Sequence, residues 1–330
     1  MTRRSRTRRS RLLTAAALLT LTAATMTGCV TVHGERALLP AVTKAEAAKT
    51  LSDFARTNNK ANRAYDATLI SSIETGSRGA IDQAGLKAHH AASPGGNPTY
   101  TSIKLTDAHY LIPQQRGWPK WFVADVHSSQ TPNSRWLLAF QRGSATDSWK
   151  ASYLGVAPET ALPELARDKD GYVESVPLTG SDLLVQPALL GSAYADYLQR
   201  GAKGSDVFAA GGATSGERAT RAKNSRSADS VTLYADQPAS PGAFMPVALR
   251  TKGGGALVFF STRHTAKTTY RTGVTPPVDQ FVTALMTGTA KHAVTLGRVS
   301  EQLVTVPAKA DGGKVRFLSR LVGLVAAKGE

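Results

Sequence analysis

The chain has a single cysteine, Cys29, and this limits how its folded body can be stabilised. Without a second cysteine no intramolecular disulfide can form, so the residues that follow must be held together by a hydrophobic core. The composition supports such a core, because 42% of the residues are hydrophobic. The 302 residues from Cys29 to Glu330 are enough for one large domain or for two of about 150 residues.

The first 28 residues have the pattern of an export signal. Six arginines and no acidic residue lie within positions 1–11, and an apolar run follows at Leu12–Ala24. This run is too short to cross roughly 30 Å of hydrocarbon as a permanent helix. The segment Met26-Thr27-Gly28-Cys29 resembles a bacterial lipobox. That resemblance implies cleavage before Cys29 and attachment of acyl chains, palmitate among them, to the new N-terminus.

A lipid anchor at Cys29 would place the mature protein on the outer face of the cytoplasmic membrane. The alternative is an ordinary cleaved signal that ends in a cysteine by chance. The export route is also open. Thr7-Arg8-Arg9 suggests twin-arginine export, but Arg11 stands where such signals prefer an apolar residue, and the alternative is a generic basic segment of the general route.

The net charge of +16 limits the choice of partners. Removing the signal, with its six arginines, leaves about +10. This excess favours contact with anionic lipid head groups, anionic cell-wall polymers or another envelope protein. The alternative is that it serves only solubility. Nucleic acid is not expected as a partner, because the basic residues are scattered and lack an interleaved aromatic patch.

The first half of the mature chain shows helical periodicity and then strand patterns. Thr43 and Glu46 form a capping box that starts a helix, and further helical stretches end near Gly76 and cover residues 80–90. A Pro- and Gly-rich breaker follows at residues 93–98. Short turn-like separators then predict antiparallel strands. These strands are expected at Tyr110–Ile112, Trp121–His127, Trp136–Gln141 and Ser148–Val156.

The second half repeats this order. A helix with an apolar face from Leu190 to Leu198 ends at Gly201, and a Gly-, Ala-, Ser- and Arg-rich stretch covers residues 201–228. A short helix is expected near Val278–Met286. The predicted strands are Val231–Tyr234, Phe244–Arg250, Ala256–Thr262, Ala293–Val306 and Lys314–Val325.

Helices followed by antiparallel strands indicate an α+β fold rather than alternating βαβ units. The order of elements resembles a duplicated unit of the nuclear-transport-factor-2-like type, which implies two similar halves, each with helices packed into a curved antiparallel sheet. The whole chain also resembles uncharacterised actinobacterial lipoproteins of unknown function. We expect a signal peptide over 1–28, a tether over 29–42, a first domain over 43–156, a linker over 157–182 and a second domain over 183–330.

Motifs of several enzyme classes are missing from the sequence. It contains no Gly-x-Ser-x-Gly, no Ser-x-x-Lys, no phosphate-binding loop and no dinucleotide fingerprint. His89 and His90 are adjacent and point about 100° apart on a helix. Asp168–Gly171 lacks the carboxylates that a calcium loop needs at its first and last positions. We therefore predict no catalytic residue, no cofactor and no metal site.

Four residues of the first predicted sheet are candidates for ligand binding. All four tryptophans lie within residues 118–149, and aromatic rings in a curved sheet can stack on envelope sugars. Trp118 lies in a Gly-Trp-Pro turn and is the tryptophan expected to be exposed. Asp125 and His127 share a strand face because side chains alternate, and with Arg142 they would line a concave pocket. The alternatives are a packed sheet face for the tryptophans and a solvent-facing edge for the polar residues.

Three functions are compatible with these features. The favoured one is a non-catalytic binding or assembly module of the cell envelope, which holds a small ligand, a glycan or a protein partner. The second is an envelope hydrolase with a site assembled from scattered residues. The third is the solute receptor of an importer, but such receptors need two βαβ lobes, which the strand order does not indicate.

Overall fold

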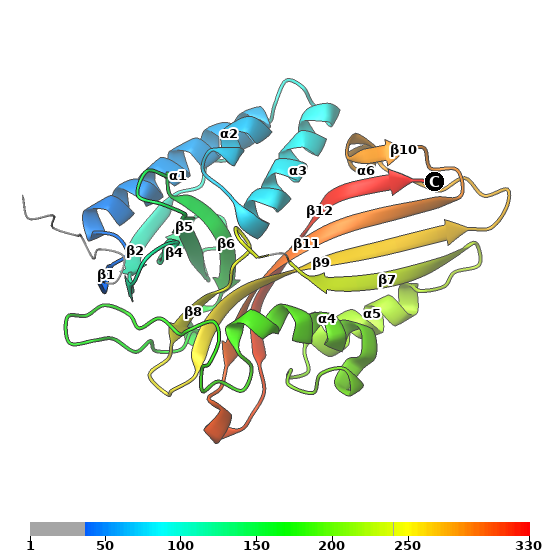
Figure 1. The fold of residues 1–330 in the computed structure, drawn as a ribbon. Helices are drawn as coiled ribbons and strands as arrows, with labels where there is room; N and C mark the ends of the chain where they lie inside the picture. The colour runs from blue at the N-terminus through cyan, green and yellow to red at the C-terminus, as the bar shows by residue number, and fades with distance from the viewer. Residues whose placement is uncertain (1–36, 240) are drawn as a thin grey trace, which may run out of the picture.

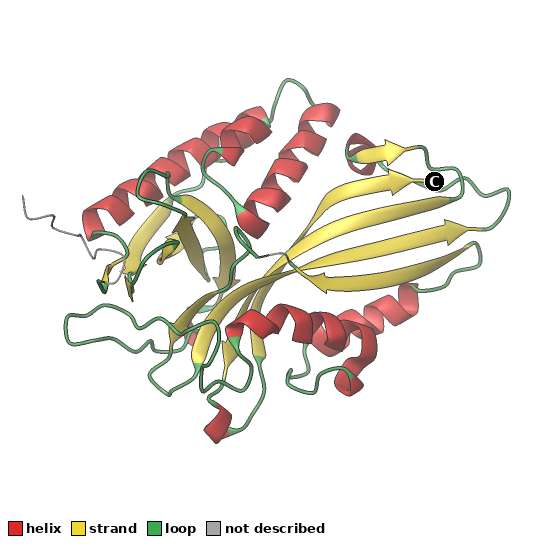
Figure 2. Ribbon diagram, viewed as in Figure 1, coloured by secondary structure: helices red, strands yellow, loops and turns green. Residues whose placement is uncertain are grey.

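The computed structural model describes residues 37–239 and 241–330 (Figure 1). The predicted signal peptide, Cys29 and the first part of the predicted tether lie outside the described residues. Helices and mostly antiparallel sheets make up the described part, which confirms the α+β class (Figure 2). The similarity of the two halves stays a prediction.

The first half is a four-stranded antiparallel sheet in the order β2-β4-β5-β6, covered by helices, with a small β1-β3 pair beside it. Its elements are β1 (Leu39–Pro40), α1 (Lys44–Ala64), α2 (Ala67–Ser71), α3 (Gly76–Ala92), β2 (Leu105–Leu111), β3 (Gln114–Gln115), β4 (Lys120–Ser128), β5 (Arg135–Arg142) and β6 (Lys150–Ala157).

The second half is a six-stranded sheet in the order β10-β12-β11-β9-β7, with β8 also paired to β9. Only β10 and β12 run parallel. Its elements are α4 (Leu190–Arg200), α5 (Glu217–Asn224), β7 (Ser230–Pro238), β8 (Val247–Arg250), β9 (Ala256–Tyr270), α6 (Gln280–Ala284), β10 (Met286–Gly288), β11 (Ala293–Val306) and β12 (Arg316–Gly329). Short 3₁₀ turns lie at Glu159–Ala161, Pro187–Leu189, Gly201–Lys203 and Lys309–Asp311, and a π-helical turn at Gly212–Gly216.

Helix α1 begins at the predicted cap. The Thr43 hydroxyl accepts a hydrogen bond from the Glu46 amide at 3.1 Å. The reciprocal half of the predicted capping box is wrong, because the Glu46 carboxylate is used elsewhere. It accepts a hydrogen bond from Trp149 Nε1 at 2.8 Å and pairs with Arg142 at 3.2 Å. This carboxylate therefore joins α1 to the sheet.

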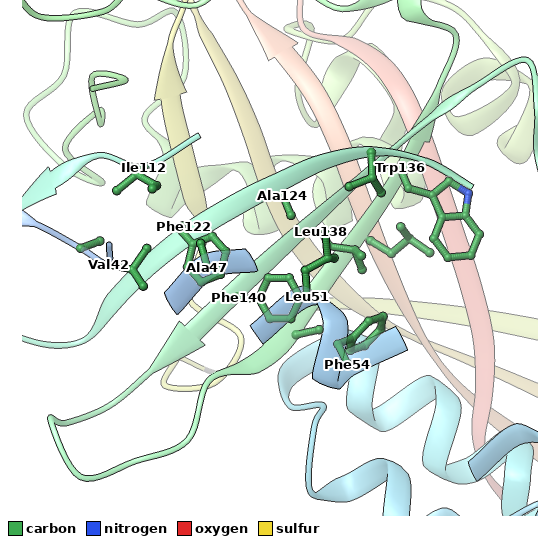
Figure 3. Close-up of a cluster of buried hydrophobic side chains, with 14 of the residues drawn as sticks. Val42, Ala47, Leu51, Phe54, Ile112, Phe122, Ala124, Trp136, Leu138 and Phe140 are labelled. Carbon is green, nitrogen blue, oxygen red and sulfur yellow. The ribbon is translucent and has the colours of Figure 1, made fainter. Parts of the chain in front are cut away.

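Strand β4 is buried on both faces, which explains its almost continuous apolar sequence. Phe122 and Ala124 on one face pack with Leu51 and Phe54 of α1 (Figure 3). Trp121 and Val123 on the other face belong to a second cluster. That cluster is shared with the larger sheet, through Val247, Leu249, Leu257, Phe259 and Leu303.

The two sheets therefore pack face to face, and helix α4 covers the far face of the larger sheet through a third cluster with Tyr194 and Phe260. The result is four layers in the order helix, sheet, sheet, helix. Gly155 of β6 lies at the contact between the sheets, because a Cβ there would come within 2.6 Å of Leu303 Cδ2. The distal parts of β11 and β12 extend past the smaller sheet and pack against α3.

The segment predicted as a linker runs along the seam between the two halves. Val173 N donates to Ile112 O at 3.1 Å, and Val176 N donates to Ala248 O at 2.9 Å. In the predicted tether, β1 pairs with β3, and Ala41 and Val42 are buried. The proposed division into tether, domains and linker stays a prediction.

Several sequence-predicted elements differ in their bounds from those observed, and two of them show the reason. Gly76 was expected to end a helix, but it starts α3 with φ +59°, and its Cα lies so close to the Ala243 carbonyl that no Cβ fits. Strand β9 continues to Tyr270, beyond the expected end at Thr262. Its last residues are mostly polar and lack an apolar alternation, so the sequence pattern did not predict them as strand.

Candidate functional site

The structure splits the four sequence-predicted site residues into two pairs. In the register of β4 and β5, Lys120 lies opposite Arg142, and His127 lies opposite Arg135. Trp118 and Arg142 are therefore at one end of this hairpin, and Asp125 and His127 are near the other. The structure therefore does not bring Arg142 together with Asp125 and His127.

Trp118 and Arg142 line a hollow of about 810 Å³ at the junction of the two halves, which we call the junction hollow. This volume is in the usual range for small-ligand sites. The first half contributes the α2–α3 connection, the turn before β4 and the ends of β5 and β6. The second half contributes the segment before β8. The lining residues are Ser72, Thr75, Trp118, Pro119, Gln141, Arg142, Gly143, Asp147, Ser148, Lys150, Gly242, Ala243 and Met245.

The Arg142 guanidinium is held between two tryptophans. It lies 4.5 Å from the centre of the Trp149 ring and 5.3 Å from that of Trp118. Its Nη1 pairs with Glu46, whereas its buried Nε has no hydrogen-bond partner in the described part of the chain. Trp149 is half-buried against Phe122, but Trp118 is 39% exposed. The expectation that Trp118 would be the exposed tryptophan is thus consistent with the geometry.

Positive charge gathers around the Trp118 ring. Lys120 Nζ lies 5.9 Å from the ring centre, and Lys150 lines the hollow with its Nζ donating to Ser71 O at 2.8 Å. Burial and the neighbouring Arg142 charge lower the pKa of Lys120. The nearby carboxylates are Glu46, which already accepts a hydrogen bond from Trp149, and the exposed Asp147. The hollow therefore offers an aromatic face beside cations, a combination suited to a ring that bears an anionic group.

The wall supplied by the second half is fixed to the first half by hydrogen bonds from two buried side chains. The Tyr153 hydroxyl donates to Phe244 O at 2.8 Å, and Gln141 Nε2 donates to Met245 O at 3.3 Å. Tyr153 is fully buried. The shape of the hollow therefore depends on how the two halves are held together.

Asp125 and His127 belong to a polar cluster that is organised by Arg135. The Arg135 side chain is 1% exposed and donates to Asp125 Oδ1 at 2.7 Å and to Asp107 Oδ2 at 2.5 Å. Asp107 lies at an irregularity of β2 with φ +49°, and its carboxylate is 3.7 Å from His127 Nε2. The hydrogen bond from Arg135 lowers the pKa of Asp107. The two predicted residues do share a face, but Arg135 occupies the carboxylate that would act as an acid or base.

Sequence reasoning missed Arg135 and Asp107. Arg135 is the one charge at the start of an apolar strand. In an antiparallel hairpin it comes close to Asp125 of the preceding strand, and this pattern indicates a buried ion pair. Asp107 gave no such signal, because its left-handed backbone follows from the irregular pairing of β2.

A buried Asp–His–Ser chain lies on the larger sheet. His264 Nδ1 is 2.6 Å from Asp236 Oδ1, and His264 Nε2 is 2.6 Å from Ser300 Oγ. This order of groups is that of a hydrolase triad. However, the Ser300 side chain has no exposed surface, and its hydroxyl also contacts Thr262 and Gln302. A substrate cannot reach this hydroxyl in the structure, so we interpret the chain as a structural network.

Within residues 37–239 and 241–330, no group of three His, Cys, Asp or Glu side chains is arranged to hold a metal ion. Over the same residues, no helix combines the length and the apolar character needed to cross a bilayer.

Comparison with known proteins identifies the family. The family model described as Domain of unknown function (DUF8094) matches residues 38–329. The chain belongs to this family. An uncharacterised lipoprotein of Streptomyces avermitilis is 47% identical over 318 residues, which cover 96% of this chain and 94% of the relative. An uncharacterised lipoprotein of Streptomyces coelicolor is 44% identical over 328 residues, which cover 98% of each.

A second uncharacterised lipoprotein of Streptomyces coelicolor is 26% identical over 302 residues, which cover 88% of this chain and 82% of the relative. These matches confirm the predicted resemblance to actinobacterial lipoproteins. No solved structure matches the chain. The resemblance to the nuclear-transport-factor-2-like type therefore stays a prediction.

Proposed function

We propose that this protein is a lipid-anchored binding module of the cell envelope that holds its ligand in the junction hollow. The anchor would form at Cys29 and place the folded body on the outer face of the cytoplasmic membrane. The lipobox at Met26–Cys29 and the lipoprotein names of the relatives support this address.

The chemistry of the hollow favours an anionic sugar. The observation that carries this assignment is the half-exposed Trp118 ring beside the Arg142 guanidinium in a hollow of about 810 Å³. A sugar ring would stack on the indole, and a carboxylate or phosphate on it would pair with Arg142, Lys150 or Lys120. Glycans with these groups occur in the envelope to which a lipid anchor would confine the protein.

A titration of the mature protein with two matched oligosaccharides tests this proposal. The first is the tetrasaccharide of alternating N-acetylglucosamine and N-acetylmuramic acid, which carries carboxylates. The second is the neutral tetrasaccharide of N-acetylglucosamine. A polymer of glycerol phosphate, added in a third arm, separates a phosphate source from a carboxylate source. Calorimetry should show binding of at least one anionic ligand and weaker binding of the neutral one.

Two variants locate the binding. Trp118→Ala should weaken binding about tenfold, in line with the ~1–3 kcal/mol that stacking on an aromatic ring contributes in other ligands. Leu189→Ala removes another large side chain that is 53% exposed, far along the sequence, and should leave binding unchanged. Equal losses in both variants, or no binding of any probe by the wild type, would contradict the proposal.

A further inference from the structure

A cluster of three carboxylates around one arginine joins the two halves next to the junction hollow. Arg78 of α3 contacts Asp82 at 2.5 Å, Glu74 at 3.4 Å and Glu301 of β11 at 3.6 Å. We call these four residues the carboxylate cluster. Glu301 belongs to the second half and the other three to the first, so the cluster is a contact between halves.

The charges of this cluster do not balance when all its groups are ionised. Three carboxylates then face one guanidinium, and the side chains of Glu74 and Glu301 have no exposed surface. Neither carboxylate oxygen of Glu74 has a hydrogen-bond partner in the described part of the chain, and Glu301 Oε1 has none either. Glu301 Oε2 accepts from Leu154 N at 3.0 Å. Buried anions that outnumber their cation and lack hydrogen bonds are costly, so the arrangement favours protonated carboxyl groups.

The direction of the titration follows from this burial. Burial raises the pKa of Glu301 to about 7, and burial together with the Asp82 charge holds the pKa of Glu74 well above its usual range. Burial also raises the pKa of Asp82. Two tyrosines lie near the cluster: burial, together with the Glu301 charge, raises the pKa of Tyr153 of β6, and burial, together with the Asp82 charge, raises the pKa of Tyr100. From β12 the neighbour is Gly323, which packs against Ile81 of α3.

The cluster and the junction hollow share one short segment of chain. Ser72 and Thr75 line the hollow, and Glu74, between them, points into the cluster. Thr75 N donates to Ala151 O at 2.9 Å, and the adjacent Gly76 packs against the Ala243 carbonyl of the opposite wall. A displacement of α3 from β11 would therefore move both walls of the hollow.

We propose that the protonation state of the carboxylate cluster controls the junction hollow. While the cluster keeps its extra protons, α3 stays packed on β11 and the Ser72–Gly76 wall stays in place. When a rise in pH removes them, like charges face each other across the two halves, the wall loosens, and the anionic ligand binds less tightly. This regulation rests on the function proposed for the same hollow.

Hydrogen–deuterium exchange of the ligand-free mature protein is the first test. After correction for the chemical exchange rate, the amides of residues 72–76 and 243–245 should exchange roughly tenfold faster at pH 8 than at pH 6. Glu301→Gln keeps the shape of the side chain without a titrating proton and should reduce this difference to about twofold. Asp82→Asn gives a second variant for the case in which Glu301→Gln does not fold. Glu164→Gln, at a side chain that is 78% exposed, is the control and should behave as the wild type.

Calorimetry with the carboxylate-bearing tetrasaccharide is the second test and separates the two proposals. We expect roughly tenfold weaker binding at pH 8 than at pH 6 in the wild type, and nearly equal binding at the two pH values in Glu301→Gln. Binding that is independent of pH in the wild type would overturn the inference and leave the binding function standing. An equal pH dependence in the wild type and in Glu301→Gln would also overturn it. Absence of binding at both pH values would overturn the proposed function instead.

Discussion

The two faces of strand β11 carry buried polar clusters of opposite character. On one face Glu301 meets Arg78 and two further carboxylates of the first half. On the other face Asp236 and His264 form a hydrogen-bonded chain with Ser300. There Arg221 donates to Asp236 at 2.7 Å and to Glu217 at 2.8 Å. The first cluster has a surplus of carboxylates, whereas the carboxylates of the second each have a cationic partner.

Because of this difference, the first cluster can respond to pH, whereas the second only stabilises the fold. Where every buried carboxylate has a partner, losing one group costs stability at any pH near neutrality. Where carboxylates outnumber cations, a change of pH alone alters the charge. The matched cluster lies within the second half, between α5 and the larger sheet, whereas the unmatched one lies between the halves. The junction hollow is therefore next to the cluster that responds to pH.

The largest expected effect comes from breaking the matched cluster. Asp236→Ala leaves the Arg221 guanidinium buried without its 2.7 Å partner and removes the acceptor of His264. We expect a loss of about 3–5 kcal/mol in the free energy of unfolding, measured by chemical denaturation at pH 7. Asp229→Ala, at an exposed pair with Arg271, is the control and should cost less than about 1 kcal/mol. Similar losses in both variants would contradict the matched role of Asp236.

The next largest effect is the pH dependence of stability that the carboxylate cluster causes. The pKa of Glu301 is raised from 4.5 to about 7, so the folded protein keeps a proton that the unfolded chain loses between these values. The stabilising contribution is therefore full below pH 4.5 and is lost as the pH rises through 7. We expect the free energy of unfolding to fall by about 3 kcal/mol at most from this group, and Glu301→Gln to flatten the profile. A wild-type free energy of unfolding that does not change from pH 5 to 8 would contradict this prediction.

A smaller effect is expected in the junction hollow. Arg142→Lys keeps a positive charge but loses the planar group between Trp118 and Trp149. Binding of the carboxylate-bearing tetrasaccharide should weaken about fivefold, since stacking on an aromatic face is worth ~0.5–1 kcal/mol at exposed sites. Arg56→Lys, at a side chain that is 70% exposed on α1, should bind as the wild type does. Unchanged affinity in Arg142→Lys would remove Arg142 from the site.

The smallest effect is expected at the cluster around Arg135. The His127 ring is 35% exposed and only approaches Asp107, at 3.7 Å. His127→Ala should change the free energy of unfolding by about 0.5 kcal/mol or less and should leave ligand binding unchanged. Denaturation and calorimetry on this variant check both statements. A loss of binding would show that the second end of the β4–β5 hairpin takes part in the site.

Much of the fold follows from local patterns in the sequence. Strand β11 has the predicted bounds of Ala293–Val306, because valine and leucine recur along both of its faces from one end to the other. Gly201 ends α4 with φ +66°, as its position predicts. By contrast, the start of α3 at Gly76 depends on a packing contact with Ala243, more than 160 residues away in the sequence. Local patterns contain no information about such a contact.

The candidate site was only partly predictable for the same reason. Trp118 and Arg142 each gave a local signal, an aromatic ring in a turn and a charge at a strand end. The carboxylate cluster gave none, because Glu74 and Glu301 are distant in sequence and each resembles an ordinary surface residue. The register of β4 and β5 decided which predicted residues meet, and it separated Asp125 and His127 from the hollow.

The indole N–H signals of the four tryptophans test directly whether an anionic sugar binds at the junction hollow. The indoles are labelled with nitrogen-15, and the mature protein is titrated with the carboxylate-bearing tetrasaccharide at pH 6. We expect the Trp118 signal to shift in a saturable manner and those of the buried Trp121 and Trp136 to stay in place. A saturable shift elsewhere with Trp118 unmoved, or no shift at all, would contradict binding at the junction hollow.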